Sequence, residues 1–200
     1  SRVVYSKIGG DGLRGELYTH ERGVYVVPAE GGEPSRVTAS GSRPRFAASG
    51  ERIYLIGQDD GRTTLESVDL SGGDRRVHLS AEAASEIVPS PDDRFVAVVE
   101  RFNAYVAPLP LTGRTIQFSP TTTEYPVRRI SRDAGHYVAW TPDSRRLYWS
   151  MGPTLFHREL SETFAFEALA YDRNENVLDV EFTWSSGTAS VASVSATGVA

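Results

Sequence analysis

The sequence predicts an all-β protein, a β-propeller of four-stranded antiparallel blades that forms an incomplete ring or a fragment of a larger propeller. Runs of β-branched and aromatic residues are bounded by Gly, Pro, Asp and Ser clusters at short intervals, as is typical of strands. One hairpin plan recurs in three segments, and its turn residues Ala48, Pro91 and Pro142 are 43 and 51 residues apart. Four strands in a unit of about 40–45 residues are typical of a propeller blade.

The recurring hairpin consists of a short strand, a tight turn and a second, apolar strand. Proline presets φ at the first central position of such a turn, and Asp or Ser can bond back to the nearby backbone. The alignment of the three segments pairs Ala48 with Pro91 and Pro142, Ser49 with Asp92 and Asp143, and Ile53 with Val96 and Leu147.

Two further strands complete each unit. A third strand is expected over 65–70, 105–109 and 155–160, and once earlier over 24–29. Glycine-bearing turns at 31–32, 72–73 and 113 then lead to fourth strands at 36–38, 76–78 and 129–131. The runs 53–56 and 95–99 are apolar on both faces, which indicates strands sandwiched between sheets. A β-sandwich is the alternative, but unrelated hairpins need not repeat one turn chemistry at one offset.

The repeat divides the chain into propeller blades over 1–173 and a tail over 174–200. A partial blade covers 1–38, and blades cover about 43–79, 85–131 and 136–170, so the missing blades are expected upstream. The window 159–170 is interpreted as a strand. The last repeat carries its surplus residues within 113–127, where we expect a contact with another domain. Two strands, 177–184 and 188–195, are expected to lead into an adjoining β-domain.

Composition excludes several classes of function. The chain has 21 basic and 26 acidic residues among 200, a net charge of −5, which argues against a nucleic-acid surface. The absence of cysteine removes disulfides, thiolate nucleophiles and Cys-ligated zinc. No apolar run approaches the roughly 20 residues of a membrane-spanning helix.

Several segments resemble known proteins. Residues 142–149 (PDSRRLYW) and 29–38 (AEGGEPSRVT) resemble the WD-repeat-like blades of TolB-like propellers, which also occur in prolyl-oligopeptidase-type peptidases. Residues 102–110 (FNAYVAPLP) and 126–156 are similar to the propeller portion of large secreted or periplasmic proteins that carry a metal-dependent amidohydrolase domain after the propeller. The resemblance implies a periplasmic or secreted, non-catalytic region that packs against or gates that hydrolase domain, or packs against another chain of the same protein.

The chemistry implied by this resemblance is not expected within the chain. Amidohydrolases hold their metal through an H-x-H pair and further ligands, but the histidines at 20, 78, 136 and 157 are never two or four residues apart. No G-x-S-x-G nucleophile elbow occurs. A divalent, zinc-like metal is therefore expected only in the catalytic domain, beyond Ala200. Two alternatives remain: a free-standing TolB-like propeller that binds proteins or peptides, and the propeller gate of a prolyl-oligopeptidase-type serine peptidase.

Four residues are candidates for binding. His136 follows Arg132 and Asp133 at the entry to an inner strand, where propeller loops converge on the central channel, and Arg128 belongs to the same basic segment. The competing interpretations are a histidine that caps a strand and arginines paired with surface carboxylates. The nearby aromatic residues are interpreted as inter-blade core rather than as a sugar platform, and the Asp/Gly segments 10–12 and 58–61 as hairpin turns rather than calcium sites. These aromatic residues are Tyr137, Trp140, Tyr148, Trp149 and Phe156.

Overall fold

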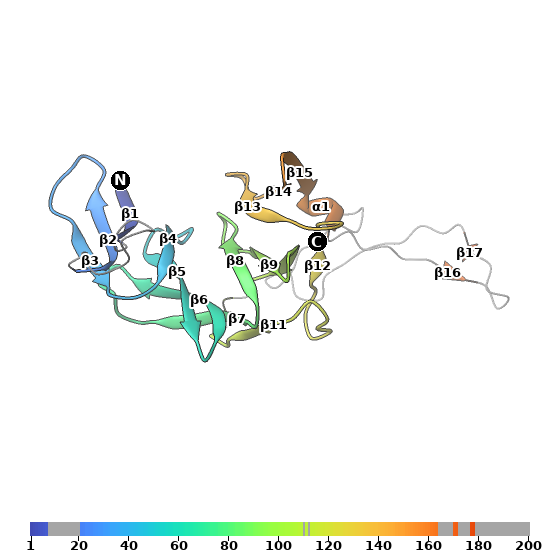
Figure 1. Ribbon diagram of the computed structural model, residues 1–200, viewed down its shortest axis with the longest axis horizontal. Coiled ribbons are helices and arrows are strands. Elements are labelled where there is room, and N and C mark those ends of the chain that lie inside the picture. The colour runs from blue at the N-terminus through green and yellow to red at the C-terminus, as the bar shows by residue number, and fades with distance from the viewer. Residues whose placement is uncertain (8–20, 110, 112, 164–169, 172–176, 179–200) are drawn as a thin grey trace.

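The computed structural model describes residues 1–7, 21–109, 111, 113–163, 170–171 and 177–178. Their strands form four main sheets that follow one another along an open arc (Figure 1). The first sheet holds β1 (Arg2–Lys7), β2 (Gly23–Pro28) and β3 (Ser35–Thr38). The second holds β4 (Ser42–Phe46), β5 (Arg52–Asp59), β6 (Arg62–Asp69), β7 (Arg76–Ala81) and β11 (Ile116–Phe118).

The third sheet holds β8 (Ala84–Pro89), β9 (Phe95–Glu100), β10 (Asn103–Pro108) and β12 (Arg128–Arg129). The fourth holds β13 (His136–Trp140), β14 (Arg146–Met151) and β15 (Thr154–Glu159). After β15 come helix α1 (Leu160–Thr163) and the pair β16 (Ala170–Tyr171) and β17 (Val177–Leu178). Within each sheet, neighbouring strands pair antiparallel except β7 and β11, so the predicted all-β propeller architecture is confirmed.

The three predicted hairpin turns have the same hydrogen bonds at the same aligned positions. Each turn is closed twice by the backbone of its first residue, whose N–H donates to the carbonyl five residues on and whose carbonyl accepts from the N–H three residues on. The residue three positions after the first one has a left-handed backbone in all three turns, with φ of 71°, 60° and 62°. The residue just before this left-handed one uses its side chain to accept a hydrogen bond from the backbone N–H two residues further along the chain, as expected for Asx and Ser turns. The first residues are Ala47, Ser90 and Thr141, and the left-handed ones are Gly50, Asp93 and Ser144.

The same turns link neighbouring sheets. The Ala48 backbone N–H donates to the Asp93 carboxylate of the next turn at 2.8 Å. The Asp92 backbone N–H donates to the Ser144 hydroxyl at 3.1 Å. Both acceptors occupy the left-handed position of their turn, so one residue ends its own hairpin and also satisfies a backbone donor of the preceding sheet.

Three hydrophobic clusters fill the spaces between sheets. In β5, Ile53 and Leu55 pack with Val24 and Val37 of the first sheet, whereas Tyr54 faces the third sheet. In β9, the side chains alternate in the same way: Val96 and Val98 face the second sheet, and Ala97 and Val99 face the fourth. The two central sheets therefore bury both faces, which is a propeller arrangement and not a face-to-face sandwich.

Two elements differ from the sequence prediction. The surplus residues of 113–127 contain β11, which pairs in parallel with β7 and adds a fifth strand to the second sheet. Residues 160–163 form helix α1, so the interpretation of 159–170 as a strand is wrong there; 164–169 lie outside the described residues. Of the tail, only β17 within 177–184 is described, and the segment 188–195 lies outside. No helix within the described ranges is long and apolar enough to cross a membrane.

Candidate functional site: an exposed aromatic cluster

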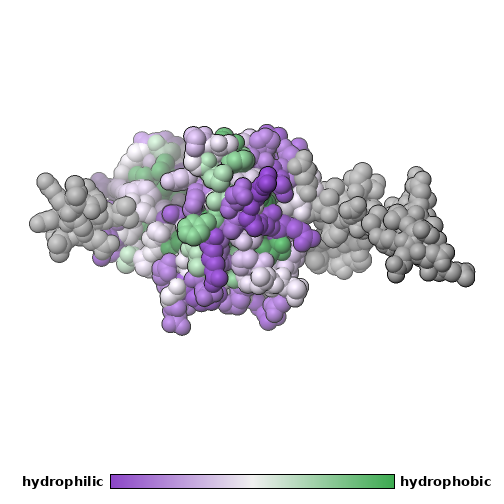
Figure 2. Space-filling view, turned by 45° about the vertical axis from the view of Figure 1, so that its right-hand side comes forward, coloured by the Kyte–Doolittle hydropathy of each residue, from purple (hydrophilic) through white to green (hydrophobic). Residues whose placement is uncertain are grey.

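Two aromatic side chains project into solvent where β9 turns into β10 and where β13 begins. Phe102 is 71% exposed and Tyr137 is 80% exposed, and the ring of His136 contacts both edge-on, with centroids 6.3 and 6.5 Å apart. We call these three residues the aromatic cluster. Figure 2 shows that apolar side chains gather in small patches among polar ones on the face it presents. An exposed group of large rings is a feature of contact surfaces.

The backbone of this cluster is held in an unfavourable conformation. Phe102 has φ of 71° and Tyr137 has φ of 55°, the left-handed region that costs a residue with a Cβ roughly 1–2 kcal/mol. Such strain persists only where the surroundings fix it, and it concentrates at functional positions. Strain and ring exposure therefore coincide at the same two residues.

Phe102 owes its positive φ to the two-residue β9–β10 hairpin loop, in which Arg101 also has a positive φ of 47°. Contacts from neighbouring elements hold Phe102 and Tyr137 in place. The Gly135 N–H donates to the Phe102 carbonyl at 2.8 Å and joins the β12–β13 loop to the β9–β10 turn. A Cβ on Gly135 would lie 2.8 Å from Trp149 Cδ1, so only glycine allows this approach. The Glu86 carboxylate on β8 accepts from the N–H groups of Tyr137 and Val138 at 2.8 and 3.0 Å. These bonds fix the bulge that turns the Tyr137 ring outward.

The four predicted binding residues are placed in different parts of this region. His136 lies inside the cluster at the start of β13, half-buried. Arg132 and Asp133 are exposed on the loop that leads to it, and Arg129 braces that loop by donating to the Ser131 carbonyl at 2.9 Å. Arg128 lies on β12 at the outer edge of the third sheet, opposite Val106. The structure thus groups His136 with Phe102 and Tyr137.

The predicted core role of the nearby aromatic residues is confirmed for some and wrong for one. Trp149 is buried and stacks on Phe156 with centroids 5.8 Å apart, and Trp140 packs against the same core while donating to the Val88 carbonyl. Tyr137 is instead the most exposed of the large apolar side chains that the structure describes. The segment 58–61 forms the predicted hairpin turn between β5 and β6, and 10–12 lies outside the described residues.

The described histidines do not form a metal centre. His78, His136 and His157 lie on the separate strands β7, β13 and β15. No group of three His, Cys, Asp or Glu residues gathers in the described part of the chain. Because a hydrolytic metal needs about three protein ligands, these residues do not fit the metal of an amidohydrolase.

One serine and histidine pair does form, between β6 and β7. Ser67 Oγ lies 2.7 Å from His78 Nε2 and also accepts from Arg52 Nε at 2.9 Å. Ser67 is only 1% exposed, and its hydroxyl oxygen is hydrogen-bonded to both Arg52 and His78. The pair therefore stabilises the sheet and does not present a nucleophile.

This pair predicts a pH-dependent stability. Burial, followed by the charges of Arg52 and Arg76, lowers the pKa of His78 below its usual value. The unfolded chain then binds a proton that the folded chain resists, so stability is lost as pH falls through about 6.5. Urea midpoints should be lower at about pH 5.5 than at about pH 7.5, and His78→Gln should reduce this difference. An unchanged difference in the variant would exclude His78 as its source.

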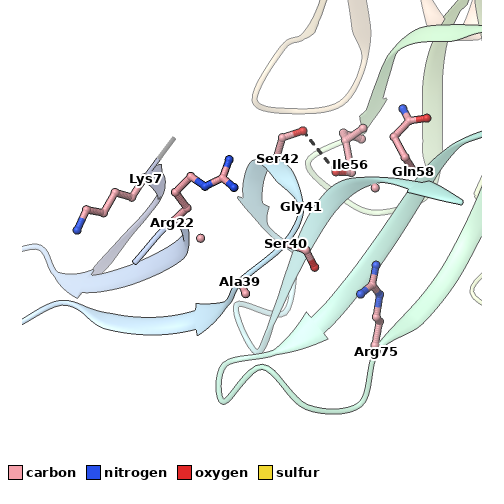
Figure 3. A pocket seen from close by; sticks show the side chains of 11 residues that line it. Lys7, Arg22, Ala39, Ser40, Gly41, Ser42, Ile56, Gln58 and Arg75 are labelled. Atoms are coloured by element: carbon pink, nitrogen blue, oxygen red, sulfur yellow. Dashed lines mark hydrogen bonds between the residues drawn. The ribbon is translucent and has the colours of Figure 1, made fainter. Parts of the chain in front are cut away.

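A separate cavity lies between the first and second sheets (Figure 3). It has a volume of about 470 Å³, and Lys7, Arg22 and Arg75 contribute cationic side chains to its lining. The Arg75 guanidinium pairs with the buried carboxylate of Glu66 at 2.5 Å. Part of the positive charge is therefore balanced within the fold, and the aromatic cluster remains the stronger candidate site.

Comparison with known proteins identifies the fold. No family model matches the sequence, and no curated protein matches it. Among solved structures, the chain is similar to TolB from Acinetobacter baumannii (TM-score 0.58, 16% identity), covering 87% of this chain and 45% of that one. It is also similar to a putative TolB from Agrobacterium tumefaciens (TM-score 0.51, 13% identity), covering 72% and 55%.

A third similar structure is a gluconolactonase from Xanthomonas campestris (TM-score 0.52, 13% identity), with coverage of 78% of this chain and 52% of that one. The chain spans about half the length of these structures. At such identities the likeness concerns the fold alone, which is a TolB-like β-propeller.

Proposed function

We propose that this TolB-like propeller chain is a non-catalytic region that packs against a catalytic domain through the aromatic cluster. The observation that carries the proposal is the exposure of Phe102 and Tyr137, at 71% and 80%, in a backbone that Gly135 and Glu86 hold in place. Large rings that are rigidly presented lose little conformational entropy on binding, and aromatic residues are enriched in protein interfaces.

The partner that we propose is a metal-dependent amidohydrolase domain of the same protein, in the periplasm or outside the cell. Support comes from the sequence segments 102–110 and 126–156, which resemble propellers fused to such domains. All three residues of the cluster belong to those two segments. The propeller would pack beside the hydrolase active site and gate access to it, and the metal would be held by the other domain.

Hydroxyl-radical footprinting of the intact protein tests the contact. In this structure Tyr137 is 80% exposed and Tyr5 is 36% exposed, so without a partner Tyr137 should be oxidised faster. If the cluster packs against another domain, Tyr137 and Phe102 should be oxidised more slowly than Tyr5. Oxidation in the order of exposure seen in the structure would contradict the proposed contact.

The adjoining reading frame and the metal content of the intact protein test the partner's identity. An H-x-H motif downstream, together with about one or two bound divalent ions per chain, is the expected result. A G-x-S-x-G motif would instead support the propeller gate of a serine peptidase. If neither motif follows and footprinting shows protection only after a second protein is added, the chain is a free-standing binding propeller.

A further inference from the structure

We propose that the cavity between the second and third sheets binds a primary ammonium group, which pairs with the buried carboxylate of Glu100. This inference is independent of the contact proposed for the aromatic cluster. The cavity has a volume of about 670 Å³ and lies where β9 turns into β10, next to the strand β11. Its lining includes Glu100, Tyr105 and Phe118, with Glu82, Arg101 and Gln117 among the others.

Glu100 carries an unmet hydrogen-bonding requirement. Its side chain is 2% exposed; Oε1 accepts from the Ala83 N–H at 3.0 Å, but Oε2 has no hydrogen-bond partner. An unpartnered polar atom in the interior costs the desolvation energy of that group, and the cost is larger for a charged one. A ligand that donates a hydrogen bond and brings positive charge would remove this cost.

The arginines of the cavity wall do not fill this role. Arg62 donates from Nε to the Ser80 hydroxyl at 2.8 Å, and Arg101 pairs with Glu82 at 3.5 Å. Asn103, which is opposite Glu100 on β10, donates to the Arg101 carbonyl. The cation that Glu100 lacks is thus not supplied by these neighbours.

A second buried carboxylate in the same fold shows how the requirement is met elsewhere. Gly57 in the second sheet occupies the position equivalent to Glu100 in the third, because Gly57 comes four residues after Ile53 and Glu100 comes four residues after Val96. The Glu66 carboxylate lies beside this glycine, since a Cβ on Gly57 would be 2.3 Å from Glu66 Oε1. Glu66 is 2% exposed, but both of its oxygens are occupied, one by the Thr64 hydroxyl and the other by Arg75. In the second sheet the chain provides its own cation, and in the third sheet it does not.

The other walls suit an alkylammonium group. The Tyr105 and Phe118 rings meet edge-on with centroids 6.0 Å apart, and they offer an apolar surface for methylene groups and cation–π attraction for the charge. Gln117, Ser119 and Thr121 also line the cavity, and each carries a side-chain oxygen that can accept a hydrogen bond. An ammonium group has three donors to satisfy, and these groups together with Glu100 provide suitable acceptors. The Glu100 carboxyl group must rotate toward the cavity to complete the contact, since Oε2 is closed off from solvent in the free structure.

NMR titration of the chain with n-butylamine and with n-butanol tests the site. The Ala83 amide, whose N–H is bonded to Glu100, should shift saturably with the amine and at least about tenfold more weakly with the alcohol. A peptide with one lysine, compared with its norleucine analogue, separates the two sources of the group. Binding of the free amine alone indicates a small-molecule ligand, whereas selective binding of the lysine peptide indicates a polypeptide.

Glu100→Gln keeps the size of the side chain and should weaken amine binding about tenfold or more. Glu51→Gln is the matched control, because this exposed side chain lies in the β4–β5 turn outside the cavity lining, and it should change binding less than about twofold. Equal binding of amine and alcohol, an Ala83 amide that does not respond to the amine, or unchanged binding in a folded Glu100→Gln variant would each overturn the proposal. The wild-type comparison of amine and alcohol remains decisive if that variant does not fold.

Discussion

Replacement of Gly72 by alanine is expected to lower the free energy of unfolding by about 2–5 kcal/mol. Gly72 lies in the β6–β7 turn with φ of 87°, and a Cβ there would lie 1.9 Å from the carbonyl oxygen of Val37 on β3. The new methyl group would thus strain its own backbone and also collide with the backbone of the neighbouring sheet. Urea unfolding followed by circular dichroism measures the loss.

Gly61 provides a matched control for this substitution. It lies in the β5–β6 turn with φ of 74°, and a Cβ there would have no atom within 4 Å. Gly61→Ala should therefore cost only the conformational part, about 1–2 kcal/mol. The additional loss of unfolding free energy in Gly72→Ala, compared with Gly61→Ala, measures the cost of disturbing the close contact between the first and second sheets. Equal losses in the two variants would mean that these sheets do not pack as described.

The turns of the fold could be predicted from sequence because their determinants are local. Pro91 and Pro142 preset φ, and Asp92 and Asp143 each accept from the N–H two residues on. The aligned position Ser49 makes the same bond in the first hairpin, although that turn has no proline. A few residues contain all the information for such a turn, so the repeat remains visible even when its length changes.

The position of β11 could not be predicted in the same way. The surplus within 113–127 is evident from spacing, but the parallel pairing of Ile116 with Leu79 joins residues far apart in sequence. A three-residue strand has no recognisable period, and its partner is chosen by which edge of the sheet is available. The contact of this segment with another domain stays a prediction.

Sequence patterns also fail at the aromatic cluster for a physical reason. Apolar residues in an all-β chain are expected inside, and by that rule Tyr137 belongs to the core. Its outward position depends on Glu86 from another sheet and on the approach of Gly135 to Trp149, which are tertiary contacts. The neighbouring His136 can be recognised as a candidate because histidine is uncommon in this chain and precedes a predicted inner strand, whereas Phe102 and Glu86 carry no comparable signal.

Trp149 and Tyr137 give the second large prediction, because the sequence predicts the same core role for both and the structure separates them. Trp149→Ala removes a ring that is 5% exposed and stacks on Phe156, so we expect a loss of about 3–5 kcal/mol in unfolding free energy. Tyr137→Ala removes a ring that is 80% exposed, so stability should change by no more than about 0.5 kcal/mol.

The two variants should also differ in what else they affect. Tyr137→Ala should weaken the proposed contact with the catalytic domain while the melting temperature of the isolated chain stays near that of the wild type. Trp149→Ala should weaken the contact and also lower the melting temperature, since Gly135 packs on that ring and holds the loop before His136. Trp149→Phe, which keeps an aromatic ring against Phe156, should recover part of the lost stability. If Tyr137→Ala proved as destabilising as Trp149→Ala, Tyr137 would be part of the core, and the aromatic cluster would not be available as a contact surface.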